Sequence, residues 1–358
     1  MTTKKLVWIR QFSQTVFFSL FLYILWSTTH PLRGIFSPTI LFEIDPLVVF
    51  LTSLSERIVL PGFIFSILMI VLTVILGRFF CGWVCPLGAF NDWVGSLKKK
   101  KIVPKDAANT KIRKIKYGIL ALVAIFALVG VQIAWVFDPL VIMARFVSLN
   151  LIPIVTLMTD KLFVLTIRGF GLYDGMIYDL YRGFKSSWLG IHVYYFSNSW
   201  IVFLFFLSIV LASLAVRRLW CRILCPLGAI YAWMAKTALV ERKTTSCMDC
   251  GICQSKCRMG AILDDLSYAK GECILCMDCI YDCPNGQTAF DWTFRKKDKS
   301  PSLEDSPSRL SRRNFLILLF SSISVLGFRN RWGRRSDRGS PITAGVIRPP
   351  GALEEKAF

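Results

Sequence analysis

The cysteines are the residues of this chain best suited to chemistry. All 12 fall into four tight groups, and only two histidines accompany them in 358 residues. The last two groups, CMDCGICQSKC and CILCMDCIYDC, share the spacing C-x2-C-x2-C-x3-C. Core thiols are usually scattered, so this grouping indicates metal ligands. Three cysteines of such a run hold one [4Fe–4S] cluster, and the fourth ligates a neighbouring cluster.

This double run predicts two [4Fe–4S] clusters. Gly251 suits a tight cluster-binding loop and Pro284 follows the second run, whereas Arg258 replaces the proline expected after the first. Zinc is the alternative, because paired C-x2-C units also bind it, although this double pattern without histidine favours iron–sulfur. The predicted ligand sets are Cys247, Cys250, Cys253 and Cys283 for the first cluster, and Cys273, Cys276, Cys279 and Cys257 for the second.

The first two groups, CGWVCPLGAF and CRILCPLGAI, both read C-x3-C-P-L-G-A. Cysteines four residues apart share one helix face, and the following proline ends or bends that turn. Four thiolates from two such turns could hold a further metal centre or form a redox dithiol. The alternative is a structural turn with reduced, buried thiols. The candidate residues are Cys81, Cys85, Cys221 and Cys225.

Long apolar stretches must position these cysteines. The chain is 54% hydrophobic and only 18% charged. Spanning a bilayer takes roughly 20 mainly apolar residues, and residues 6–27, 58–80, 117–137 and 200–219 qualify. Residues 149–167 are apolar but contain Pro153, Asp160 and Lys161, so we expect an in-plane or packed outer element there.

The basic residues predict the orientation of these spans. With the N-terminus inside, the inner segments 1–10, 77–116 and 217–314 carry 29 of the 43 lysines and arginines. An excess of this kind marks the cytoplasmic side. The net charge of +20 is therefore explained by topology, and no nucleic-acid partner is expected. All four cysteine groups are then expected on the cytoplasmic side.

The chain also repeats itself. Asp45-Pro46-Leu47 and Asp138-Pro139-Leu140 precede the second and fourth spans, and each of these spans leads into a C-x3-C-P-L-G-A turn. We expect a polytopic α-helical membrane protein, a four-helix bundle of two repeated halves with a fifth short segment, plus a small bacterial-type ferredoxin domain. The expected domains are a membrane domain at 1–245 and the two-cluster ferredoxin domain at 246–292.

In combination, the two C-x3-C-P motifs and the two-cluster run resemble membrane iron–sulfur proteins of the NapH and NosR type, over residues 1–292. The resemblance implies electron transfer from membrane quinol toward a periplasmic reductase, of the nitrate-reductase type for NapH. It implies as partners the quinone pool, a periplasmic ferredoxin or multihaem cytochrome, and a terminal reductase. It also implies the inner membrane of a prokaryote as the location.

The end of the chain resembles an export signal. A polar linker at 293–314 leads into Ser-Arg-Arg-Asn-Phe-Leu at 311–316 and an apolar segment at 315–328. This resembles a twin-arginine signal, which would make the twin-arginine translocase a partner; a fifth span is the alternative. Residues 329–358 resemble the start of a NapG-type periplasmic ferredoxin, so we expect an outward-facing tail from a truncated fusion.

Four further residues are candidates for quinol chemistry. Asp45, Asp138, His30 and His192 are expected near span ends on the outer side, where they could accept protons. The histidines could instead bind haem, with interfacial packing the simpler interpretation. Each Asp-Pro pair is also a common helix start, which we favour over quinol chemistry.

Two other functions share the cysteine motifs: a redox regulator or cofactor-assembly factor, and a zinc-binding membrane scaffold.

Overall fold

The computed structural model describes residues 3–27, 39–60, 62–96, 110–170, 183, 199–244, 247–263, 266–284 and 286–292. These residues belong to one compact unit, Met1–Ser300. His30, His192 and the linker, export-like segment and tail at 293–358 lie outside the described residues.

The first half begins with α1 and ends just after the first cysteine pair. Asp45 caps α3: its Oδ1 accepts from the backbone N–H of Leu47 at 2.8 Å, and Pro46 occupies the first turn. This confirms the helix-start interpretation of the Asp-Pro pair. The helices are α1 (Thr3–Ser27), α2 (Thr39–Glu43), α3 (Pro46–Glu56), α4 (Phe63–Leu76), α5 (Phe79–Trp83) and α6 (Pro86–Ser96).

The second half repeats this order with an extra long helix. Asp138 caps α10 in the same way, its Oδ2 accepting from the N–H of Val141 at 2.9 Å. The helical elements are α7 (Thr110–Arg113), α8 (Ile115–Val129), α9 (Ala134–Phe137), α10 (Pro139–Phe146), η2 (Val147–Leu151), α11 (Ile152–Phe170), α13 (Ser199–Ala215), η4 (Trp220–Leu224), α14 (Pro226–Met234) and η5 (Ala235–Thr237).

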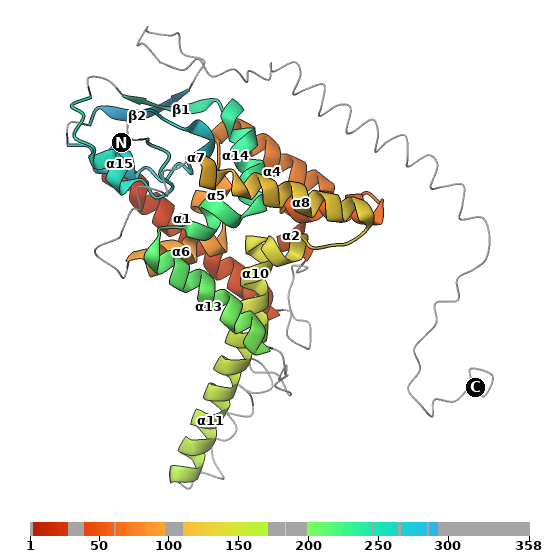
Figure 1. Ribbon diagram of the computed structural model, residues 1–358. Coiled ribbons are helices and arrows are strands. Elements are labelled where there is room, and N and C mark those ends of the chain that lie inside the picture. Colours follow the sequence, from red (N-terminus) through yellow and green to blue (C-terminus); the bar gives the residue numbers. More distant parts are fainter. Residues whose placement is uncertain are drawn as a thin grey trace, which may run out of the picture. The chain divides into compact units, whose positions relative to one another are not determined.

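The ferredoxin segment lies at the opposite end of this unit from the projecting α11 (Figure 1). It is closed by an antiparallel pair of strands in which Val240 faces Trp292. Its elements are β1 (Val240–Thr244), α15 (Ile252–Lys256), η6 (Lys270–Glu272), α16 (Asp278–Tyr281) and β2 (Thr288–Trp292).

The two halves pack crosswise. The helix that follows the Asp-Pro pair of each half contacts the helix that follows the Cys-Pro pair of the other: α3 packs on α14, and α10 packs on α6. The apolar helices do the same, because α4 contacts α14 and α13 contacts α6. The Asp-Pro-Leu turns, expected on the face opposite the cysteine turns, therefore share one core with them.

Residues 149–167, expected to form an in-plane or packed outer element, are part of a longer helix. Pro139–Ile167 is one continuous helix of 29 residues with a mean hydropathy of 2.0, and among the described residues it alone is long and apolar enough to cross a membrane. The π-helical stretch η2 precedes Pro153, where a widened turn tolerates the missing N–H. The helices within the other predicted spans include α4, α8 and α13, of 14, 15 and 17 residues.

Candidate functional site

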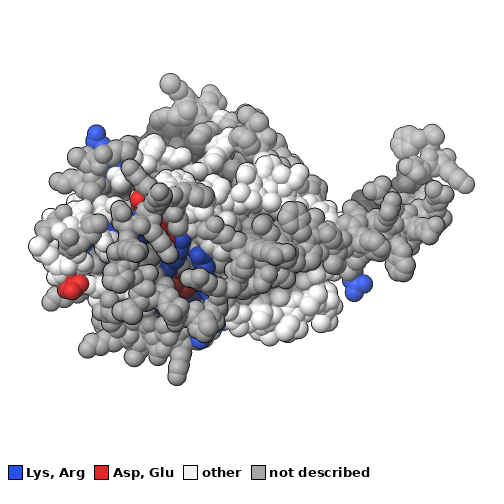
Figure 2. Space-filling view, turned by 90° about the horizontal axis from the view of Figure 1, so that it is seen from above, with Lys and Arg blue, Asp and Glu red and all other residues white. Residues whose placement is uncertain are grey.

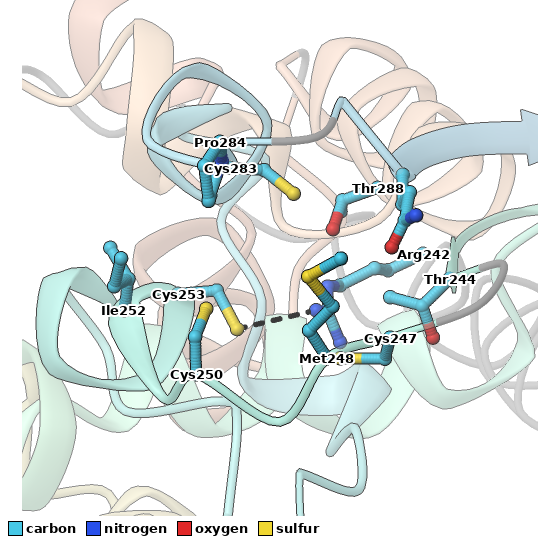
Figure 3. Close-up of a pocket in the computed structure, with 11 residues that line it drawn as sticks. Arg242, Thr244, Cys247, Met248, Cys250, Ile252, Cys253, Cys283, Pro284 and Thr288 are labelled. Atoms are coloured by element: carbon cyan, nitrogen blue, oxygen red, sulfur yellow. Dashed lines mark hydrogen bonds between the residues drawn. The ribbon is translucent and has the colours of Figure 1, made fainter.

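The first predicted ligand set lines one pocket. The four thiols come from the loop before α15, from α15 itself and from the turn after α16, and they surround a common space (Figure 3). Arg242 on β1 donates to Cys253 Sγ at 3.5 Å. Four cysteines around one pocket form the donor set of a [4Fe–4S] cluster, in which each iron takes one thiolate. The set is Cys247, Cys250, Cys253 and Cys283.

The backbone of both cluster loops has the same unusual shape. In each loop the residues just before and just after the middle cysteine have positive φ: Asp249 (49°) and Gly251 (66°) around Cys250, and Leu275 (53°) and Met277 (63°) around Cys276. Non-glycine residues seldom adopt this conformation, so its repetition indicates a shape that the ligand loop requires. Gly251 has the role expected from the sequence.

The second predicted set is also brought together. Cys257 lies within electrostatic range of Cys273, Cys276 and Cys279. Burial raises the pKa of Cys273 to about 11 and that of Cys279 to about 12. Metal ligands must be thiolates, so iron binding would supply the charge that these buried thiols otherwise resist.

All 12 thiols are free of disulfides. Within the described residues no three cysteine, histidine or carboxylate side chains converge as tightly as a single metal ion requires. The donor sets above consist of cysteines alone, which fits the cluster assignment.

The two C-x3-C-P pairs meet in the core. Their four thiols are at most 8% exposed and belong to one hydrophobic cluster. Cys85 and Cys221 lie within electrostatic range of one another, as do Cys225 and Cys81. The cysteine quartet, defined as Cys81, Cys85, Cys221 and Cys225, therefore joins the two halves of the chain.

Two buried arginines bind these turns crosswise. Each stands three residues before the first cysteine of its own half and reaches the other half. Arg218 donates to the carbonyls of Cys81 (2.8 Å) and Gly88 (3.2 Å). Arg78 Nη2 lies 2.9 Å from where a Cβ on Gly228 would stand, and its Nε and Nη2 have no hydrogen-bond partner among the described residues.

The second cluster loop docks on the first cysteine turn. A Cβ on Gly82 would lie 2.2 Å from the carbonyl oxygen of Ile274, so only glycine permits this approach. Trp83 Nε1 donates to the carbonyl of Leu275 at 3.0 Å, and Arg10 on α1 donates to that of Cys276 at 2.7 Å. Cys276 consequently belongs to the same core cluster as the quartet.

Ion pairs reinforce the docking. Arg258, which replaces the expected proline, pairs with Asp278 of the second loop and with Asp92 on α6 (2.9 Å). Asp92 also pairs with Arg218 at 2.6 Å, so one carboxylate joins the ferredoxin segment to both halves.

A second carboxylate on the ferredoxin segment contacts the bundle. Glu272 pairs with Arg78 at 3.0 Å and with Lys116 at 2.5 Å. Burial opposes its ionisation, yet these two cations hold the pKa of Glu272 below its usual value. Its charge is therefore retained in the docked state.

Sequence reasoning missed the docking residues. Arg78 and Arg218 could have been found, because the repeat is longer than C-x3-C-P and reads R-x2-C-x3-C-P-L-G-A in both halves. Gly82, Asp92 and Arg10 carry no such signal, since their contacts come from segments far along the chain.

Comparison with known proteins supports the assignment. Residues 58–104 and 198–245 match the family described as "4Fe-4S binding domain". Each match contains one C-x3-C-P pair, and the second ends just before the ferredoxin run. No solved structure matches the chain.

Several known proteins are similar over most of the described unit. An uncharacterised protein of Methanocaldococcus jannaschii is 25% identical over 70% of this chain and 92% of its own length. The ferredoxin-type protein NapH of Haemophilus influenzae is 26% identical over 66% of this chain and 57% of its own length. The regulatory protein NosR of Pseudomonas aeruginosa is 26% identical over 63% of this chain but only 24% of its own length. The chain is thus similar to iron–sulfur proteins of the NapH and NosR type, and it contains two segments that match the 4Fe-4S binding family.

Proposed function

We propose that the chain carries electrons through three iron–sulfur centres in a fixed order. The first ferredoxin cluster is followed by the second, and the second by a centre on the cysteine quartet. The observation that carries this proposal is the position of Cys276, a ligand of the second cluster that shares one buried core with the quartet. Cys279 and Cys253, from the two ferredoxin sets, are also within electrostatic range of each other.

The quartet is suited to an anionic centre. Four buried thiols from two turns lie within electrostatic range of one another. The fully buried Arg78 pairs with Glu272 through Nη1, and its Nε and Nη2 have no hydrogen-bond partner among the described residues. Arg78 is also within electrostatic range of Cys81, Cys221 and Cys225, and a thiolate-ligated iron–sulfur centre would offer acceptors to these nitrogens. When bound, the centre would accept and release single electrons; Arg78 and Arg218 hold the two turns around it.

The surface supports a multi-pass protein of the inner membrane. Large apolar side chains are exposed on helix after helix, among them Ile64 and Leu68 on α4, Leu128 on α8 and Ile201 on α13. Figure 2, which looks down on the molecule from the top of Figure 1, shows most of the visible charged side chains toward one side of the view, with one basic residue apart from them and white residues beside them. Lipid would cover such an apolar surface, leaving the N-terminus and ferredoxin segment in the cytoplasm.

The electron donor in this proposal is membrane quinol, and the acceptor is a periplasmic ferredoxin or multihaem cytochrome that serves a terminal reductase. The support comes from relatives: NapH is called a ferredoxin-type protein, and YccM of Escherichia coli a putative electron transport protein. The twin-arginine translocase would export the tail. NosR is called a regulatory protein, which makes a redox regulator the second candidate function.

Reduction by quinol separates these two functions. Membranes that contain the protein are mixed with a reduced quinone, and the clusters are followed by EPR. An electron carrier gives cluster signals that grow with quinol and disappear when an oxidant is added. Clusters that reduce with dithionite but with no quinol would contradict the quinol role and favour the regulator. Metal content of the purified protein is measured alongside: about eight irons come from two cubane clusters, and zinc without iron would identify a scaffold.

A further inference from the structure

The two Asp-Pro-Leu turns place two carboxyl groups against each other. Asp45 and Asp138 cap α3 and α10, and both are completely buried. One oxygen of each accepts backbone N–H bonds from its own helix, at 2.8 Å for Asp45 and 2.9 Å for Asp138. The two carboxyl groups lie within hydrogen-bonding reach of one another.

The remaining oxygens need a donor. Asp45 Oδ2 and Asp138 Oδ1 are buried and meet no N–H or O–H group within the described residues. None of the ion pairs found in that part of the chain involves either aspartate. Two adjacent carboxylates cannot both stay ionised in a low-dielectric core, whereas a proton on one makes it a donor to the other.

We propose that Asp45 and Asp138 share one proton and form a proton-binding site in the core. The pair then carries a single negative charge. The amino-terminal ends of α3 and α10 both point toward it, and a helix amino terminus favours negative charge. The capping bonds and the shared proton together satisfy the oxygens that the fold buries.

This site lies close to the proposed third centre. The hydroxyl of Tyr231, which is fully buried and has no partner among the described residues, is within electrostatic range of both aspartates and of Cys81 and Cys85. Tyr231 is therefore within electrostatic range of both the aspartate pair and the quartet. The link that follows rests on the proposed function, because it requires a reducible centre on the quartet.

An electron that enters this centre adds negative charge to the core and raises the proton affinity of the pair. A centre held by the four quartet cysteines would take up this electron from a reduced [4Fe–4S] cluster bound beside it. One proton leaves a hydronium ion of the solvent, which becomes water, and forms one new O–H bond on the pair. The added charge on the centre is thereby offset, and both aspartates become neutral.

Infrared spectroscopy of the purified, cluster-loaded protein tests the shared proton. At neutral pH the wild type should show a protonated-carboxyl band that shifts in D2O, and the double variant Asp45→Asn/Asp138→Asn should lack it. Glu56→Gln is the control, because Glu56 is exposed on the same helix α3 and its loss should leave the band unchanged. A wild type without this band, or a double variant that retains it, would overturn the proposal.

The single variants and a reduced-minus-oxidised spectrum extend this test. Each single asparagine variant keeps an amide donor facing the other carboxyl, so it should fold and retain cluster absorbance. In a reduced-minus-oxidised spectrum the carboxyl band should change in the wild type but not in the double variant. If the carboxyl band does not change on reduction, although EPR shows that the quartet centre is reduced, the coupling between reduction and protonation of the pair is overturned. An absent quartet signal would instead count against the proposed function, and the band of the oxidised protein would remain.

Discussion

At the scale of single residues, the molecule depends on close backbone approaches between segments far apart in sequence. Gly82 shows this most clearly, because the carbonyl of Ile274 occupies the space that any side chain would need. The nearby Trp83 and Arg10 then fix the loop around Cys276 by donating to its carbonyl groups. The approach of this loop to the first cysteine turn therefore depends on a residue with no side chain.

Gly82→Ala should displace the second cluster loop. Its methyl group would overlap a backbone carbonyl that cannot rotate away, and overpacking of this kind costs about 1–3 kcal/mol. Thermal unfolding should occur at lower temperature, and the EPR signal of the second cluster should broaden or weaken. Gly118→Ala on α8 is the control, since nothing lies within 4 Å of its added Cβ and alanine favours helix. Equal behaviour of the two variants would contradict the docking role of Gly82.

At the scale of elements, the crosswise packing of two halves determines where the cysteine turns lie. The sequence was sufficient to predict the Asp-Pro helix starts and the repeat, because these depend on short spacings; the two cluster ligand sets stay predictions, although the fold brings their cysteines near one another. It could not show that the Asp-Pro-Leu and C-x3-C-P turns share one core, since α3 on α14 and α10 on α6 are contacts between halves. The long helix at Pro139–Ile167 was also missed, because the ionisable pair Asp160 and Lys161 argued against a span there.

Arg218→Lys tests the crosswise connection. Lysine keeps the charge but cannot reproduce the bonds of the guanidinium to Asp92, Cys81 and Gly88. A lost hydrogen bond to a charged group costs about 1.5–3 kcal/mol, so we expect a marked loss of thermal stability in detergent. Lys243→Met is the matched control, because that lysine is 40% exposed in its pair with Asp291, and exposed pairs contribute about 1 kcal/mol or less. Similar losses in both variants would refute the special role of Arg218.

At the scale of the whole molecule, the structure links a ferredoxin segment to a helical bundle through buried contacts rather than through a flexible tether. Asp92 of the bundle binds cations from both parts, Glu272 of the ferredoxin segment binds two cations of the bundle, and Cys276 lies in the bundle core. The central claim is that three centres, not two, lie along this connection.

An EPR redox titration of the wild type beside Cys81→Ser and Cys225→Ser tests this claim most directly. Each substitution removes one quartet thiol and leaves all eight ferredoxin cysteines in place. The account predicts that the wild type shows one signal beyond those of two [4Fe–4S] clusters, and that both variants lose this signal while the ferredoxin signals remain. Identical spectra in the wild type and both variants would contradict the claim that the quartet holds a redox centre.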